Sequence, residues 1–480
     1  MEPEKQKFYL TNAIPYVNAS PHIGFAMELV ASDLLARFYR LAGFDVHFLA
    51  GTDENSLKNV LAAEKANLPT NEFVNEYARK FIDLGQALEI SNDSFIRTTE
   101  KKHIQGAQKL WAACQPEDIY KKAYEGLYCV GCEQFYSAGE LINGLCPEHG
   151  TKPELVKEEN YFFKLSNYQK DLERLIESGE LEILPAFRKK EIFNFIKSGL
   201  VDFSISRSRE RARGWGVPVP GDDAQVMYVW FDALSCYITG LDYATNGELY
   251  RKYWPGNHMI GKGIIRFHAV YWPAMLLSAG LPLPKKIFVH GYLTVDGQKM
   301  GKSLGNSVDP VALIKKYGAD PVRYFLLREI PFGQDGDFSV AKLEARYQGD
   351  LANGLGNLLS RVTNLVETDL DGVVPDTVPS PKDLDEVYDL VSELKFHEAL
   401  EQIWKEIAWA NKYIDETKLW DQAQKNPQLF SEVISNLVAL LADIATKLSP
   451  FMPETAERIR IVLSAEKIKK SEPLFPRIST

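Results

Sequence analysis

The 480-residue sequence lacks the features that would assign it to a membrane or a secreted protein. Its most apolar stretch, residues 269–284, is interrupted by Pro273 and Gly280, whereas a membrane-spanning helix needs roughly 20 unbroken apolar residues. The N-terminal sequence MEPEKQKFYL lacks the apolar run of a secretory signal peptide. We therefore expect a cytoplasmic protein without a membrane segment.

Cysteine is scarce and unevenly placed. The chain has five cysteines, an odd number, and three of them fall close together. A framework of disulfides is therefore not expected, because clustered cysteines in a cytoplasmic chain more often bind a metal ion. The five residues are Cys114, Cys129, Cys132, Cys146 and Cys236.

An excess of positive charge is also missing, since the formal net charge is −10. This argues against a protein that coats nucleic acid without specificity, although local basic patches could still contact one particular RNA. Two basic runs occur at residues 188–190 and 207–213, and taken alone they are best interpreted as solvated faces. With 45% hydrophobic and 25% charged residues, the composition is that of an ordinary globular protein.

The N-terminal segment has the pattern of a strand, a helix and a second strand. Lys7–Asn12 is rich in aromatic and branched residues, and Ser20 and Pro21 could cap and begin a helix that ends at Gly43. Residues 45–50 form the second strand. A β-α-β unit predicts a parallel sheet whose site lies at the carboxyl ends of its strands.

Four potential metal ligands occur in two closely spaced pairs. Cys129 and Cys132 are separated by two residues, as are Cys146 and His149. Two such chelating turns suit tetrahedral zinc, and four protein ligands indicate a structural ion. Cysteines that merely pack in a small core are the alternative, which this spacing makes less favourable.

Two short motifs could contact a nucleotide. His22 and Gly24 stand at the start of the first helix, where free N–H groups and the helix dipole favour a phosphate. Lys299, Lys302 and Ser303 form a flexible basic segment that could neutralise a leaving pyrophosphate. Each motif taken alone is more typical of an ordinary surface segment.

Together, these motifs resemble the HIGH and KMSKS signatures of class I aminoacyl-tRNA synthetases, and the segments between them resemble the methionyl-tRNA synthetases. The resemblance implies that ATP, accompanied by Mg²⁺, is bound by His22, Gly24, Lys299, Lys302 and Ser303, of which the first four are catalytic. It also implies a zinc ion on the cysteine pairs. The implied methionine-binding residues are Ile14, Tyr16, Asp53, Trp230, Ala233, Tyr237, Ile264 and His268.

The physical chemistry of these residue types agrees with the resemblance. The thioether of methionine packs well against aromatic rings, which Tyr16, Trp230 and Tyr237 would supply, and Asp53 would pair with the ammonium group. In the C-terminal part, Asn357 and Arg361 are four residues apart on one helical face. With Trp420, they match the residues that read the anticodon in this family, and tRNA(Met) is the implied partner.

The expected fold is α/β: a Rossmann-type parallel-sheet catalytic domain with a zinc-bearing connective insertion, followed by an α-helical anticodon-binding bundle. The expected boundaries are 1–117 and 225–340 for the two halves of the catalytic domain, 118–224 for the insertion and 341–480 for the bundle. We expect a methionine–tRNA ligase that acts as a monomer.

Four sites, with five residues in all, depart from the family pattern, and they leave other functions open. Phe25 replaces the second histidine of HIGH, Asn55 and Ser56 replace a His-Gly pair, Gly263 replaces an aspartate and Gly301 replaces a serine. One alternative is a paralogue that activates another amino acid or charges another acceptor. The other is a non-catalytic protein that binds tRNA or senses an amino acid, which the retained His22 and lysines disfavour.

Overall fold

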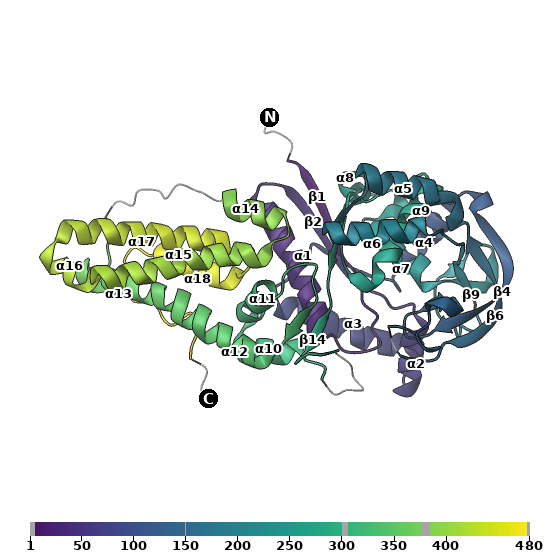
Figure 1. Cartoon of the computed structure of the whole chain (residues 1–480), viewed down its shortest axis with the longest axis horizontal. Coiled ribbons are helices and arrows are strands. Elements are labelled where there is room, and N and C mark those ends of the chain that lie inside the picture. The colour runs from purple at the N-terminus through teal and green to yellow at the C-terminus, as the bar shows by residue number, and fades with distance from the viewer. Residues whose placement is uncertain (1–4, 149, 300–305, 376–384, 478–480) are drawn as a thin grey trace. The chain divides into compact units, whose positions relative to one another are not determined.

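The computed structural model describes residues 5–148, 150–299, 306–375 and 385–477 (Figure 1). By its contacts, the chain divides into two compact units. The first comprises Met1–Pro21, Ala42–Gly85 and Ser91–His290, and the second comprises His22–Leu41, Gln86–Ile90 and Gly291–Thr480.

A six-stranded parallel sheet is the centre of the first unit. Its strand order is β3-β2-β1-β12-β13-β7, and every neighbouring pair is parallel. The expected parallel sheet is thus confirmed. Its strands are largely buried, as is usual for a parallel sheet with both faces covered. The strands are β1 (Lys7–Asn12), β2 (Asp45–Thr52), β3 (Ser94–Arg97), β7 (Glu182–Leu184), β12 (Asn257–Gly261) and β13 (Lys286–His290).

Most helices of the same unit pack into one core with this sheet, and α7 contributes the fully buried Phe231. Helix α7 is almost wholly apolar, which suits a helix that is buried on nearly all sides. The helices are α2 (Leu57–Lys65), α3 (Thr70–Ala87), α4 (Lys101–Ala113), α5 (Gln169–Ser178), α6 (Ala186–Lys197), α7 (Val229–Thr239), α8 (Glu248–Tyr253) and α9 (Trp272–Ser278).

The segment expected to be an insertion forms antiparallel sheets of its own. One has the order β5-β4-β6-β8 and another the order β10-β11-β9. The segment also supplies β7 to the parallel sheet. The strands are β4 (Ile119–Cys129), β5 (Gln134–Tyr136), β6 (Glu154–Phe163), β8 (Phe203–Ser204), β9 (Ser206–Ser208), β10 (Pro218–Val219) and β11 (Asp222–Met227).

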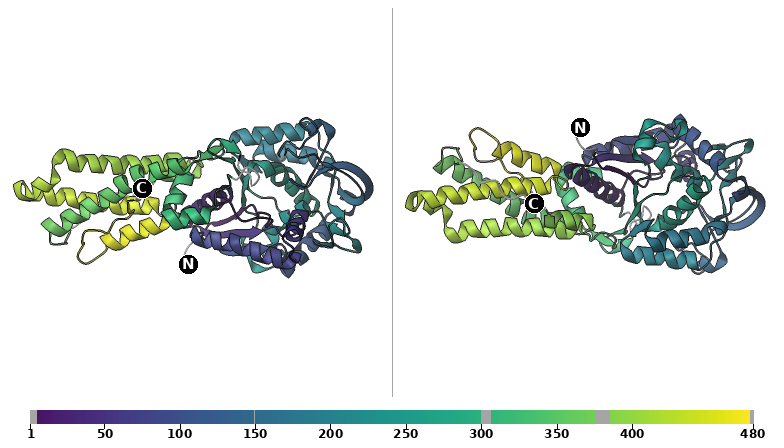
Figure 2. Two further views of the ribbon diagram at one scale, coloured as in Figure 1. Left: turned by 90° about the horizontal axis from the view of Figure 1, so that it is seen from below. Right: turned by 90° about the horizontal axis from the view of Figure 1, so that it is seen from above.

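The second unit is mostly helical. Helices α13, α15 and α17 run side by side in Figure 1 and again in the rotated views of Figure 2. The helices are α1 (Ile23–Leu41), α10 (Pro310–Tyr317), α11 (Ala319–Arg328), α12 (Val340–Arg346), α13 (Asn357–Asp369), α14 (Asp385–Ser392), α15 (Phe396–Thr417), α16 (Leu419–Lys425), α17 (Pro427–Leu448) and α18 (Pro453–Leu463). The strands are β14 (Leu293–Val295), β15 (Gln298–Lys299) and β16 (Gly336–Phe338).

The start of α1 differs from the sequence-based expectation. Ser20 and Pro21 do not cap and begin the helix, because its first residue is Ile23. The N–H of Ile23 donates to the carbonyl of Val308, a residue far along the chain, so this N–H needs no local cap.

Helix α17 is longer than segment 269–284, which the sequence had singled out. Among the described residues it is the one helix that is long and apolar enough to cross a membrane, by length and composition alone. Half of the relevant window is buried within the structure, and a buried core helix passes the same test.

Candidate active site and metal centre

Some of the expected methionine-binding residues lie beyond the carboxyl ends of adjacent strands of the parallel sheet, whereas Trp230, Ala233 and Tyr237 lie on α7. Ile14 and Tyr16 follow β1, Asp53 follows β2, and Ile264 follows β12. Tyr16 and Asp53 form an isolated parallel bridge, so the pairing of β1 and β2 is briefly resumed at the site. Carboxyl ends of neighbouring parallel strands are where α/β sheets bind ligands.

Gly51 allows this close approach of the two strand ends. A Cβ atom added to Gly51 would lie 2.4 Å from the carbonyl oxygen of Ile96 and 2.9 Å from Cγ2 of Ile14. The carbonyl oxygen of Ile96 could not give way cheaply, because it is backbone of the next strand. Glycine therefore sets the spacing of the strands just before Asp53.

The ring of His268 is held in one neutral tautomer. Its Nδ1 lies 2.9 Å from the carbonyl oxygen of Ile264, which can only accept, so Nδ1 carries the proton. Its Nε2 then accepts the hydroxyl of Tyr237 over 2.6 Å. Burial lowers the pKa of His268 to about 4, so the pocket presents an uncharged imidazole at neutral pH.

Aromatic rings surround this histidine. Trp230 lies parallel to Phe267, with ring centroids 3.7 Å apart, and its ring is edge-on to His268 at 6.4 Å. Nε1 of Trp230 and the hydroxyl of Tyr16 are buried without a hydrogen-bond partner among the described residues. Trp230 and Tyr16 thus offer apolar ring faces with a polar atom at the ring edge, and such surfaces can accommodate a flexible thioether side chain.

Asp53 is the carboxylate that the sequence assigned to the amino group, and it is only 2% exposed. Burial, reinforced by the nearby Asp232, raises the pKa of Asp53 well above its usual range. A cation bound beside Asp53 would lower this pKa again, because its positive charge offsets the buried negative charge.

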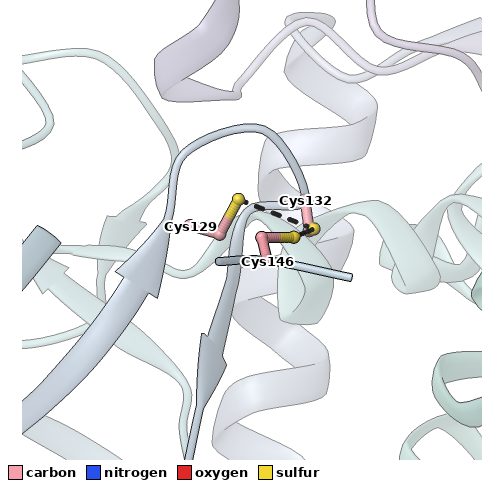
Figure 3. Close-up of side chains that lie close together, drawn as sticks. All are labelled: Cys129, Cys132 and Cys146. Atoms are coloured by element: carbon pink, nitrogen blue, oxygen red, sulfur yellow. Dashed lines mark hydrogen bonds between the residues drawn. The ribbon is translucent and has the colours of Figure 1, made fainter. Parts of the chain in front are cut away.

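Three cysteines gather at the end of β4 and in the loops that follow, as Figure 3 shows. Sγ of Cys132 lies 3.7 Å from Sγ of Cys129 and 3.2 Å from Sγ of Cys146, and the three sulfurs could hold a metal ion. Burial raises the pKa of the Cys132 thiol, so a bound cation is what would keep it as a thiolate. The fourth predicted ligand, His149, lies outside the described residues.

The expected ATP-binding residues belong to the second unit. His22 is exposed, and its Nδ1 accepts the N–H of Gly24 over 3.1 Å. Lys299 ends β15 after a tight turn at Asp296, but its side chain is outside the described part, as are Lys302 and Ser303.

The expected anticodon residues lie on helices of the same unit. Asn357 and Arg361 on α13 share a face as predicted, because each bonds to α15: Nδ2 of Asn357 donates to Asn411 over 3.0 Å, and Arg361 pairs with Asp415 at 2.5 Å. Trp420 on α16 is 49% exposed, which leaves much of its ring accessible.

Comparison with known proteins decides the family. A family model described as "tRNA synthetases class I (M)" matches residues 8–152 and 136–363. The methionine–tRNA ligase of Clostridium acetobutylicum is 45% identical, and the match covers 99% of this chain and 79% of the relative. The ligase of Brucella melitensis is 42% identical over 97% of this chain and 93% of that one.

The chain belongs to this family of class I tRNA synthetases. A solved structure agrees: methionyl-tRNA synthetase of Mycobacterium tuberculosis, in complex with methionyl-adenylate, is 40% identical and superimposes with a TM-score of 0.92. That match covers 98% of this chain and 100% of the other. The resemblance, the α/β fold and the assignment as an aminoacyl-tRNA ligase are therefore confirmed.

The family resemblance did not identify every residue near the pocket. Asp232 and His103 are both buried, and Asp232 lies close enough to Asp53 to affect its pKa. A signal was present, because Asp232 is the only charged residue in the apolar α7. Nothing in the sequence pointed to His103, because only the fold brings it next to Asp232.

The basic run at residues 207–213 has mixed environments in this synthetase. Arg207 is buried over the rings of Tyr128, Phe135 and Tyr228, so the expectation of a solvated face is wrong for it. Arg211 pairs with Glu154 at the surface, where the expectation holds.

Proposed function

We propose that the protein activates methionine with ATP and transfers it to tRNA(Met). The observation that carries the proposal is the buried cluster in which a neutral His268, held by Tyr237, adjoins Trp230, within a member of this synthetase family. The chemistry of methionine fits, because its side chain is apolar and polarizable and its ammonium group would meet Asp53.

The reaction would proceed in two displacements. The carboxylate oxygen of methionine attacks the α-phosphorus of ATP, and the bond to the β-phosphate oxygen breaks to release pyrophosphate. A terminal ribose hydroxyl of tRNA then attacks the carbonyl carbon, loses its proton and displaces AMP. Mg²⁺ would accompany ATP, and no enzyme nucleophile is needed, so positioning and electrostatics supply the catalysis.

His22 and the lysines would act on the phosphates. His22 stands directly before α1, and the N-terminus of this helix favours an anion. Lys299, Lys302 and Ser303 would contact the leaving pyrophosphate. Phe25 cannot donate a hydrogen bond as the family's histidine does, and the loss of one transition-state donor typically costs about 10²–10³ in rate.

The cysteine site would hold one structural zinc ion, with Cys129, Cys132, Cys146 and His149 as ligands. Three thiol sulfurs at this separation form the soft donor set that zinc prefers. The ion would stabilise the turn after β4, whose own core is small.

Asn357, Arg361 and Trp420 would read the anticodon of the tRNA. Their support is the exposure of Trp420 and the polar pairs between α13 and α15. The domain boundaries given above, a monomeric state and a cytoplasmic location stay predictions.

The test is amino-acid-dependent exchange of pyrophosphate into ATP with each standard amino acid, followed by charging of tRNA. Exchange with methionine alone supports the proposal. Exchange with a different amino acid would make the protein a paralogue, and no exchange at all would leave a binding protein. Charging of tRNA(Met) but not of other tRNAs tests the second step.

A further inference from the structure

A chain of polar contacts leads from Asp53 into the interior of the first unit. The backbone N–H of Asn55 donates to Oδ1 of Asp53 over 3.3 Å, and its side-chain amide donates to Oδ2 of Asp232 over 2.8 Å. The other oxygen of Asp232 lies 2.5 Å from Nε2 of His103 on α4. Asn55 therefore connects the loop after β2 to α7, the helix that carries Trp230 and Tyr237.

Asp232 has the environment of a buried carboxylate anion. Its side chain is fully buried, and both of its oxygens face nitrogen donors, from Asn55 and His103. His103 is equally buried, and its second nitrogen lies 2.8 Å from the hydroxyl of Thr239. Paired hydrogen bonds to both oxygens are what stabilise a negative charge that is removed from water.

The charge of Asp232 acts on Asp53, because both lie in the same buried region. After burial itself, Asp232 is the largest cause of the raised pKa of Asp53. Glu54 is paired with Arg97 at 2.6 Å, so most of its charge is balanced. Six titratable groups interact electrostatically with Asp53. They are Asp232 and Cys236 on α7, Glu54 next to Asp53 in sequence, Glu133 after the cysteine turn, Lys58 on α2 and Tyr16 after β1.

We propose that Asp232 is a positioning residue for the amino-acid substrate: through Asn55 it fixes Asp53, and its charge makes the pocket select a cationic amino group. This inference rests on the proposed function, because it assumes that the substrate ammonium group lies at Asp53. Asn55, which stands where the family usually has histidine, supplies both hydrogen bonds of the connection.

Asp232→Asn tests the charge while it preserves the shape of the side chain. We expect KM for methionine to rise about 10- to 100-fold, the usual effect of losing a hydrogen-bonded charge. KM for ATP should change by no more than about twofold, because Asp232 is proposed to act on the amino group of methionine and not on ATP. The acidic limb of kcat/KM for methionine should move to lower pH, since Asp53 loses its repelling neighbour.

A purely structural role for Asp232 would leave that acidic limb in place, and this result would overturn the inference. Asp118→Asn is the matched control, because Asp118 is also a buried, hydrogen-bonded carboxylate of the first unit, bound to Ser278 and Tyr168. It should leave KM for methionine and the acidic limb unchanged. His103→Gln keeps a nitrogen donor for Asp232 and should restore most of the affinity that His103→Ala loses.

Two further measurements keep the inference testable. If Asp232→Asn fails to fold, as judged by circular dichroism, Asn55→Ala replaces it, because Asn55 is only partly buried. An unchanged KM for methionine in Asn55→Ala then overturns the inference.

Calorimetric binding of L-methionine and of its α-hydroxy analogue, which lacks the ammonium group, separates the inference from the proposed function. The wild type should prefer methionine, and Asp232→Asn should reduce that preference. Binding with this preference but without pyrophosphate exchange would overturn only the proposed function, and absence of binding would overturn both.

Discussion

The hydroxyl of Tyr237 donates to Nε2 of His268 over 2.6 Å, in a contact that needs the imidazole to be neutral. Protonation of Nε2 would replace the acceptor with a second donor, and the buried ring would then carry an unpaired charge. The proposed methionine-binding region is thus tied to one protonation state of His268.

The first prediction concerns the stability of this pocket at acidic pH. The pKa of His268 is about 4 in the folded chain and about 6.5 when unfolded, so its contribution is present above pH 6.5 and is lost as the pH falls towards 4. The loss should amount to about 3 kcal/mol over that range. Melting temperatures of the wild type and His268→Gln between pH 7 and 4.5 measure it, and the variant should show the shallower decline.

A matched variant tests the cause of this pH dependence. Tyr237→Phe keeps the imidazole and removes the donor that favours its neutral form, so the pKa of His268 should rise and the decline should become less steep. Identical declines in the wild type and in both variants would contradict the assignment.

The second prediction concerns Arg323 on α11, which is fully buried. Its guanidinium pairs with Asp33 at 2.7 Å and donates to the carbonyls of Leu88, Pro450 and Phe451. Arg323→Met leaves Asp33 without this buried partner and should cost about 3–5 kcal/mol of stability.

Thermal unfolding compared with Arg37→Met provides the control for Arg323. Arg37 also pairs with Asp33 at 2.7 Å, but its side chain is 25% exposed, so its loss should cost no more than about 1 kcal/mol. If both variants melt at the same temperature, the buried pair has no special contribution.

The third prediction concerns the cysteine site. The purified protein should contain about one zinc ion per chain, as a closed four-ligand site requires. Cys146→Ser should lose the ion and melt at a lower temperature, whereas Cys114→Ser should keep it, because Cys114 is buried away from the cluster. Elemental analysis by mass spectrometry decides, and a metal-free wild type or a fully loaded Cys146→Ser would refute the site.

The fourth prediction concerns tRNA binding by the helical unit. Trp420→Ala should raise KM for tRNA about 10- to 100-fold, because stacking on one base contributes about 1–3 kcal/mol. Exchange of pyrophosphate should stay unchanged, since it needs no anticodon. Trp409→Ala is the control: Trp409 is 57% exposed but stacks on Tyr413 of its own helix. Equal losses in both variants would contradict a specific role for Trp420.

Local patterns predicted a large part of the fold. Lys7–Asn12 was predicted as a strand and is β1, and residues 45–50, predicted as the second strand, lie within β2. These features depend on side-chain periodicity alone, which is visible within a few residues. The clustering of Cys129, Cys132 and Cys146 could likewise be predicted from local sequence, because short loops bring closely spaced residues together.

Contacts between distant segments could not be predicted in this way. The start of α1 at Ile23 depends on Val308, and the burial of Arg207 depends on rings from three other stretches of chain. In each case the local sequence is compatible with the opposite outcome, because the deciding partner lies far along the chain.

The sequence by itself was enough to predict the family and the clustering of Cys129, Cys132 and Cys146, because these follow from motifs and spacing. Only the tertiary structure decided the tautomer of His268 and the environment of Asp53. Both depend on groups that the chain brings from far away, among them Asp232 and His103, which are 129 residues apart in sequence and 2.5 Å apart in space. Burial then sets the protonation of these groups, since the free energy of a charge depends on everything that surrounds it.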